Sequence, residues 1–323
     1  PGDDQWFRAS NNEVVPMPGR FRHRLGTGKR GEDVLSGLIH GTRVSLTIGL
    51  LSMGIAALLG ILFGSLAGYF GDNRLATTRG RFITVCIGLL LAWYYGFSVR
   101  SFALADALSA SNASILLSLM WSLLIFLGIC LVSWWTGGYV ARIPGAEKKI
   151  YIPVDAAISR MIEILISLPN LVLIITIAAI AKPSMVNLMI IIGVTSWTGI
   201  ARLTRAEFLK IRNLEYIQAG QALGFSEARV IFRHALPNAI APALVAVAFG
   251  IASAILVESA LSFLGIGVPA DIVTWGSLLF SGREHFAAWW LVVFPGIAIF
   301  VTVTVYNLLG EGFRDAIDPR HKQ

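Results

Sequence analysis

Charged residues are scarce in this chain: Asp, Glu, Lys and Arg together make up 14% of its 323 residues. A soluble domain usually contains about 25% of them, so the sequence is not typical of one. The chain has two cysteines and no regular glycine repeat, which excludes a disulfide scaffold and a collagen. Hydrophobic residues, at 55%, are too abundant for a disordered chain. These absences leave a protein that crosses a membrane several times.

The chain is nevertheless basic, with 26 Lys and Arg residues against 19 Asp and Glu residues and a net charge of +7. A nucleic-acid partner would explain such an excess in a soluble protein. In a membrane protein the same excess is typical of cytoplasmic loops. We therefore expect a lipid bilayer around the chain and no nucleic acid among its partners.

Seven apolar windows are long enough to cross the hydrocarbon core, which takes about 20 residues. They cover residues 43–69, 82–99, 114–135, 162–181, 185–203, 239–266 and 287–310. The fourth and fifth windows are separated only by Lys182-Pro183-Ser184, which predicts a tight hairpin. No long run of alternating residues competes with this interpretation, so an all-α polytopic transmembrane bundle is predicted.

The Lys and Arg residues between the windows predict the orientation. Sixteen of them lie in four segments, which are 70–81, 136–161, 202–238 and 311–323. The segments on the opposite side hold only three, namely Arg100, Lys182 and Arg283. We therefore expect the first set, and with it the C-terminus, to be cytoplasmic.

Seven spans that end in the cytoplasm place the N-terminal segment 1–42 outside. That segment is itself basic, through Arg20, Arg22, Arg24, Lys29 and Arg30. A transmembrane helix upstream of Pro1 would hold it outside against the charge rule. The parity therefore predicts a parent protein with eight spans.

The cytoplasmic segment 204–238 is too long and too strongly patterned for a simple connection. Asn213 is a suitable N-cap for a short helix, and Gly224 is placed to end that helix in the left-handed conformation. Ser226 is a suitable cap for a second helix, which we expect Pro237 to stop. The pattern predicts two short helices joined at a glycine elbow outside the membrane.

Small residues at the centre of this elbow, Ala219, Gly220 and Ala222, would allow the cleft of a partner to close over it. Apolar anchors are expected from Tyr216, Ile217, Leu223, Phe225 and Ile231. An amphipathic helix pair that lies on the lipid surface is the alternative. The small residues favour a protein partner, because a face that binds lipid gains from bulk.

The elbow carries a family resemblance. Gln218-Ala219-Gly220, Gly224 and Leu236-Pro237 match the spacing of the EAA–Gly–x–Leu-Pro signature of bacterial ABC importer permeases. More narrowly, the chain resembles the second permease subunit of dipeptide and oligopeptide importers over about 25–80 and 155–320. Further matching stretches are Gly41-Thr-Arg-Val-Ser-Leu46, Gly64-Ser-Leu-Ala-Gly-Tyr-Phe-Gly71, Arg233-His-Ala-Leu-Pro-Asn238, Glu258-Ser-Ala-Leu-Ser-Phe-Leu-Gly-Ile-Gly267, Trp275-Gly276 and Asn307-Leu-Leu-Gly-Glu-Gly-Phe-Arg-Asp-Ala-Ile-Asp-Pro319.

The resemblance implies a type I (MetI-like) permease fold and a division of the chain. An external N-terminal segment, 1–42, precedes a transmembrane permease domain, 43–320. Within that domain, 82–150 is expected to be an inserted transmembrane hairpin and 204–238 a cytoplasmic coupling loop. The resemblance also leads us to expect the usual first helix of the family upstream of Pro1, in agreement with the parity.

Two positions depart from the signature. Gln218 and Gly220 stand where it has Glu and the second Ala, so any role of that Glu is not available here.

The resemblance also implies partners and a location. Such a subunit forms half of a translocation pathway in the bacterial inner membrane. A second permease subunit forms the other half, two cytoplasmic ATP-binding subunits hydrolyse the ATP, and an external solute-binding protein delivers the peptide substrate. No catalytic residue is then expected in this chain. The ATPase-coupling residues would be Gln218, Ala219, Gly220, Gly224, Arg233, Leu236 and Pro237.

Two residues carry specific hypotheses. A side chain at Gly224 would strain the left-handed cap by about 1 kcal/mol and crowd the closing interface, although Gly224 can also be read as a plain helix C-cap. Glu258 is expected towards the external end of its span. A carboxylate at mid-span costs about 2.5–3.5 kcal/mol, so such residues usually face a cavity or a partner. We expect Glu258 either at the external gate or substrate path, or as a snorkelling or paired residue at an interface.

Other chemistry has little support. The chain has no Gly-x4-Gly-Lys-Ser/Thr loop, and its five histidines show no ligand pairing, so neither a cofactor nor a metal is expected. Gly60 and Gly64 predict a close helix contact, for which the sister permease is one candidate partner. Substrates other than peptides, such as a nickel chelate, glutathione or a sugar, stay open. An ion-driven transporter is a further alternative, but mid-span carboxylates are nearly absent.

Overall fold

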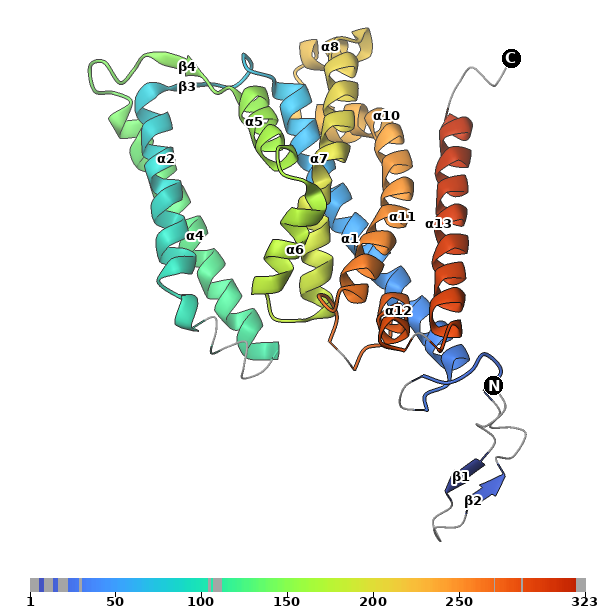
Figure 1. Cartoon of the computed structure of the whole chain (residues 1–323). Helices are drawn as coiled ribbons and strands as arrows, with labels where there is room; N and C mark the ends of the chain where they lie inside the picture. Colours follow the sequence, from blue (N-terminus) through green and yellow to red (C-terminus); the bar gives the residue numbers. More distant parts are fainter. Residues whose placement is uncertain are drawn as a thin grey trace. The chain divides into compact units, whose positions relative to one another are not determined.

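The chain is almost entirely helical in its described parts, as Figure 1 shows for the computed structural model. The structure describes residues 6–8, 14–16, 23–28, 31–103, 106, 112–269, 271–285 and 287–317. Several basic residues used above for topology lie outside them, namely Arg20, Arg22, Lys29, Arg30, Arg320 and Lys322. The described elements support the predicted all-α fold.

The elements follow one another in a simple order along the chain. They are β1 (Trp6–Arg8), β2 (Val14–Pro16), α1 (Val34–Phe70), β3 (Ala76–Thr78), α2 (Arg79–Trp93), the π-helix η2 (Tyr94–Ser98), α4 (Asn112–Val140), β4 (Lys149–Tyr151), α5 (Val154–Ile166), α6 (Asn170–Ile180), α7 (Met185–Ile211), α8 (Glu215–Ala222), α9 (Glu227–Arg229), the π-helix η3 (Val230–Ala235), α10 (Leu236–Ala239), α11 (Ala241–Phe263), α12 (Trp275–Glu284) and α13 (Trp290–Ile317).

The chain divides into two compact units. One, here called the main unit, combines residues 1–69 with 157–323. The other, the hairpin unit, comprises residues 70–156 and encloses the segment 82–150. That this segment is an insertion stays a prediction, as do the boundaries of the predicted domains.

Six helices in the described part are long and apolar enough to cross a membrane, and a seventh span is formed if α5 and α6 are taken together. Six of the seven predicted windows are thereby confirmed, and the fourth, 162–181, corresponds to the bent pair α5 and α6. The prediction of a continuous fourth helix is wrong, because α5 and α6 meet at an angle of 81°. Pro169, which precedes α6, lacks a backbone N–H and restricts Leu168 to extended conformations, so the helix breaks there.

The hairpin predicted at Lys182-Pro183-Ser184 is present in the main unit. Helix α6 ends at Ile180 and α7 begins at Met185, and the two helices pack against each other. The side-chain amide of Asn187 donates a hydrogen bond of 3.0 Å to the backbone carbonyl of Lys182, which holds the turn.

Helices α1 and α7 pack with almost no space between their backbones. A Cβ placed on Gly60 would lie 2.7 Å from the Cβ of Ile200, and one on Gly64 would lie 2.7 Å from the Cβ of Thr204. Small residues allow membrane helices to approach this closely. The predicted close contact of these glycines is therefore present, but its partner is α7 of the same chain.

The hairpin unit consists of α2 and α4, which pack side by side, and of the strands β3 and β4, which pair in antiparallel fashion. The guanidinium of Arg81 lies 4.2 Å from the ring centroid of Trp134, so a cation–π contact joins the two helices. Cys86 and Cys130 are both free.

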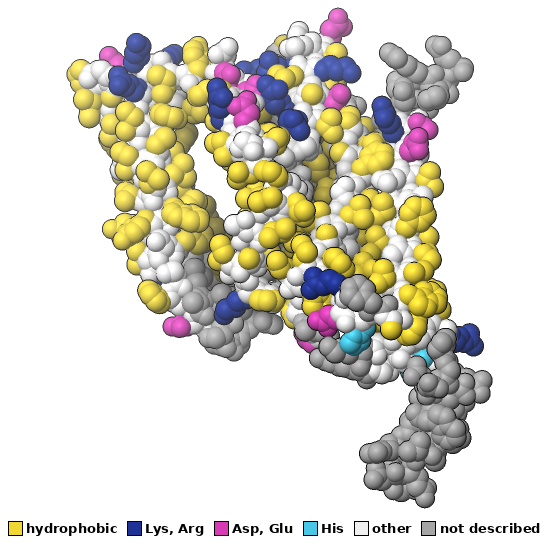
Figure 2. All heavy atoms as spheres, viewed as in Figure 1, with side chains coloured by type: hydrophobic (Ala, Val, Ile, Leu, Met, Phe, Trp, Pro, Cys, Tyr) yellow, Lys and Arg dark blue, Asp and Glu magenta, His cyan; other side chains and the backbone are white. Residues whose placement is uncertain are grey.

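The main unit has two chemically different ends. Helix α8 and the end of α13 lie at one of them, and α12 and the start of α1 lie at the other (Figure 1). Most Lys and Arg side chains visible on this unit gather at the α8 end (Figure 2). The elbow and the C-terminal helix end thus share one side, as the topology prediction requires. Which side of the membrane it faces stays a prediction.

Candidate functional site

The segment after α7 folds as a sharp elbow of two short helical arms. The first arm is α8, and the second is α9 followed by η3. Gly224 stands between them with φ +77°, the left-handed conformation that its position predicts. The hydroxyl of Ser226 accepts a hydrogen bond from the backbone N–H of Arg229 at 3.4 Å, so the predicted cap of the second arm is also present.

Two details of the predicted elbow are wrong. The N-cap of α8 is Leu214, because Asn213 directs its side-chain amide back to the carbonyl of Leu209, at 3.2 Å. Pro237 does not stop the second arm. It lies in the first turn of α10, where a residue without an N–H removes no helical hydrogen bond, and the chain continues almost directly into α11.

The predicted coupling residues are mostly at the surface of the elbow. Gln218, Ala219, Gly224, Arg233 and Pro237 are exposed. Leu236 is half-buried and Gly220 is buried. A Cβ on Gly220 would lie 3.4 Å from the ring of Phe225, an ordinary van der Waals distance, so the packing of that ring does not require glycine.

The predicted apolar anchors divide into two groups. Ile217 and Ile231 are buried within the chain, and the two arms that carry them pack against each other. Tyr216, at 45% exposure, and Leu223, at 75%, remain at the surface. Phe232 is 64% exposed and joins them, although its place in the pattern did not single it out. Its position directly after the buried Ile231 gave no signal, because neighbouring residues of a helix lie only about 100° apart around its axis.

Tyr69, near the end of α1, connects both arms of the elbow to the bundle. Its side chain is fully buried. Its hydroxyl donates a hydrogen bond to the carboxylate of Glu227 on the second arm and accepts one of 3.1 Å from the side-chain amide of Gln221 on the first. The guanidinium of Arg212 adds a hydrogen bond of 3.1 Å to the carbonyl of Gly68. The elbow is therefore attached to α1 as well as to its neighbours in sequence.

Glu258 lies on α11 and is fully buried. Its carboxyl accepts hydrogen bonds from the hydroxyls of Ser262 at 2.9 Å, Ser45 at 3.2 Å and Ser259 at 3.4 Å. The hydroxyl of Ser45 in turn accepts a bond of 3.4 Å from the backbone N–H of Trp275. The carboxyl thus joins α11 to α1 and, through Ser45, to the start of α12. Of the two expected roles, this burial favours the paired residue at a helix interface.

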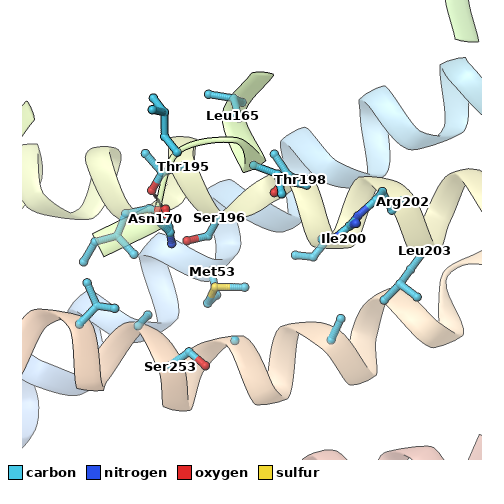
Figure 3. A pocket seen from close by; sticks show the side chains of 18 of the residues that line it. Met53, Leu165, Asn170, Thr195, Ser196, Thr198, Ile200, Arg202, Leu203 and Ser253 are labelled. Carbon is cyan, nitrogen blue, oxygen red and sulfur yellow. Dashed lines mark hydrogen bonds between the residues drawn. The ribbon is translucent and has the colours of Figure 1, made fainter. Parts of the chain in front are cut away.

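A cavity of about 750 Å³ lies between the break of α5 and α6, helix α7 and helix α11 (Figure 3). Helix α7 contributes polar side chains to its wall, including Thr195, Ser196, Thr198 and Arg202, and α11 contributes Ser253 from the opposite side. The cavity was not predicted, because its wall comes from segments that are distant in sequence and its polar residues match no motif.

Comparison with known proteins gives consistent matches. Residues 137–323 match the family model described as binding-protein-dependent transport system inner membrane component. The chain is 32% identical to the di/tripeptide transport system permease protein DppC of Pseudomonas aeruginosa over 305 residues, which cover 94% of this chain and 74% of the relative. It is 39% identical over 199 residues to a putative peptide transport system permease protein of Brucella suis, covering 59% of this chain and 67% of the relative.

A third relative spans nearly the whole chain. The inner membrane ABC transporter permease protein YejE of Escherichia coli is 27% identical over 310 residues, which cover 96% of this chain and 67% of the relative.

Proposed function

Because this chain belongs to the family of binding-protein-dependent transport system inner membrane components, we propose that it imports di- and oligopeptides with energy from ATP. It is an inner membrane protein with several membrane-spanning helices. In the proposal it forms half of a translocation pathway, which a second permease subunit completes. Two cytoplasmic ATP-binding subunits hydrolyse the ATP, and an external solute-binding protein delivers the peptide. The names of the relatives support the peptide substrate.

The elbow is the observation that carries the proposal. Its exposed surface combines the large apolar side chains of Tyr216, Leu223 and Phe232 with the small exposed residue Ala219. An apolar surface outside the membrane-spanning helices favours a protein partner, and aromatic residues are typical anchors of such interfaces. We assign this surface to the cleft of an ATP-binding subunit.

The contacts of the elbow suggest how movement of that subunit would reach the bundle. Closure of the ATPases would displace the two arms, which Tyr69 attaches to α1. Helix α1 in turn packs against α7 through Gly60 and Gly64. Because these contacts leave no free space, α1 and α7 should move together. Such a two-state movement would open the pathway alternately to each side of the membrane.

Glu258 is proposed to hold the opposite end of the same bundle together. Its hydrogen bonds join α11 and α1, and α12 is held through Ser45. In the proposed orientation this end is external and would receive the solute-binding protein. The carboxyl would then act on a gate only by fixing the helices around it.

Purification of the full-length, C-terminally tagged protein in mild detergent tests the proposal. We expect ATP-hydrolysing subunits and a second permease to be recovered with it, as identified by mass spectrometry and ATPase activity. Gly224→Asp should release the ATPases, because an aspartate at φ +77° strains the elbow and adds charge to its surface.

Gly145→Asp is the matched control. Gly145 also has a positive φ, +88°, and open space around its Cα, but it belongs to the hairpin unit. It should therefore retain the ATPases. A folded wild-type protein that elutes alone, or a Gly224→Asp variant that keeps its ATPases and imports peptide normally, would contradict the proposal.

A further inference from the structure

The polar side chains of the cavity differ in how they are bonded. The hydroxyls of Thr195 and Ser253 donate to backbone carbonyls of their own helices, at 2.9 and 3.2 Å. Asn170, Ser196 and Arg202 line the same cavity, and none of their side chains makes a hydrogen bond or ion pair with another described residue. Asn170 and Arg202 are exposed and Ser196 is half-buried, so their side chains are accessible to a polar ligand or to water.

The charge of the cavity wall has one sign. Arg202 is the only ionisable residue among those that line it. Arg202 also lines a smaller adjoining cavity together with Glu163, but the carboxylate of Glu163 is paired with the guanidinium of Arg160 at 2.7 Å. Arg202 therefore has no carboxylate of its own in the described part of the chain, and the cavity favours an anionic group.

The cavity also has room for a small molecule. Residues spaced by three or four along α7, namely Thr195, Gly199 and Arg202, present one face of that helix to it. A Cβ on Gly199 would have no atom within 4 Å. On the opposite side of the cavity, α11 presents the small residues Gly250 and Ala254, which leave space for a ligand. Hydroxyl and amide groups thus line the open part of the cavity, and the guanidinium of Arg202 lies at one end of it.

We propose that Arg202 binds the carboxylate of a peptide in this cavity. The inference rests on the proposed peptide import. A guanidinium holds a carboxylate through two parallel hydrogen bonds, and the terminal carboxylate is present in every peptide whatever its sequence. Asn170 and Ser196 are placed to bond the peptide backbone. The permease itself, and not only the external binding protein, then selects for a free carboxyl end.

A pair of peptides tests the site. Proteoliposomes with the complete transporter and enclosed ATP are given the solute-binding protein, saturated with either Ala-Ala or its C-terminal amide. Arg202→Gln should lower uptake of Ala-Ala about tenfold and uptake of the amide less than about twofold, because only the first peptide loses a charged hydrogen-bond partner. Since the binding protein is the same throughout, a change in the ratio of the two rates originates in the permease.

Two further variants make the result specific. Arg202→Lys keeps the cation and should retain a reduced preference for Ala-Ala. Lys210→Gln removes a cation from the same helix, where Lys210 lies 3.9 Å from Glu207, and should change neither rate. ATP hydrolysis stimulated by the binding protein should persist in all three, which shows that the complex is assembled.

The outcomes separate the two proposals. If Arg202→Gln lowers the uptake of both peptides equally, or lowers the uptake of neither, the carboxylate site alone is overturned. A wild-type complex that imports neither peptide would overturn the proposed function and the site together.

Discussion

Helix α7 has two faces that differ in packing. On the face towards α1, a Cβ on Gly193 would lie 2.7 Å from the Cβ of Ile55, and Gly60 of α1 is equally close to Ile200. On the face towards α11, a Cβ on Gly199 would meet nothing within 4 Å. Glycine therefore allows close helix packing on the face towards α1 and leaves open space on the face towards α11.

The difference assigns separate tasks to the two faces. In lipid, helices associate through close packing of small residues, so the α1 face makes α7 part of a fixed wall. The α11 face carries the cavity, with its polar side chains and Arg202. The same kind of substitution should therefore damage stability on the first face and transport on the second.

Gly60→Leu should have the largest effect. A side chain there overlaps Ile200 and the carbonyl of Trp197, so α1 and α7 must separate. Overpacking of this kind costs about 3 kcal/mol, which would lower the midpoint of thermal unfolding in detergent and the yield of the complex. A variant as stable as the wild type would show that the two helices are not packed as described.

Gly199→Leu should have the next largest effect, on transport alone. The added side chain occupies open space in the cavity, so the unfolding midpoint should stay close to that of the wild type. Peptide uptake by proteoliposomes should fall at least tenfold, because the added side chain fills part of the cavity. Undiminished uptake by this variant would mean that peptide does not pass along this face.

Tyr69→Phe should have the smallest effect, which concerns the coupling between the elbow and helix α1. It removes the hydrogen bonds to Gln221 and Glu227 while leaving the ring in place. We expect the ATP hydrolysed per peptide imported to rise about fivefold, which corresponds to roughly 1 kcal/mol. Tyr151→Phe, at an exposed tyrosine of β4, is the control and should leave the ratio unchanged.

If Tyr69→Phe leaves the ratio at the wild-type value, the elbow is not driven through the hydroxyl of Tyr69. The remaining routes would be the hydrogen bond from Arg212 to Gly68 of α1 and the direct continuation of the chain from α7 into α8.

Features governed by local chemistry could be predicted from the sequence. The apolar windows, the turn at Lys182-Pro183-Ser184 and the left-handed Gly224 each depend on a few consecutive residues. The break between α5 and α6 was missed although Pro169 marks it, because apolar composition is the same on both sides of the bend. A hydropathy window reports the length and composition of an apolar segment, but not a change in the direction of its helix axis.

Apart from the close contact at Gly60 and Gly64, the features that depend on packing could not be predicted. Ile217 and Tyr216 are adjacent apolar residues of the elbow, yet only the first is buried, because the bundle covers one face of α8. The role of Tyr69 depends on a contact with residues more than 150 positions away. Met53 and Ser253 likewise line the same cavity, and no residue spacing within one segment indicates that they lie near each other.

ATP-dependent uptake by the reconstituted transporter tests the central claim most directly. Proteoliposomes with both permeases and both ATPases should take up a labelled dipeptide only when they enclose ATP and when the solute-binding protein is present. Collapse of proton and sodium gradients with ionophores should leave the rate unchanged. Uptake that proceeds without ATP and stops when an ion gradient is collapsed would contradict the assignment of the elbow and identify an ion-driven transporter instead.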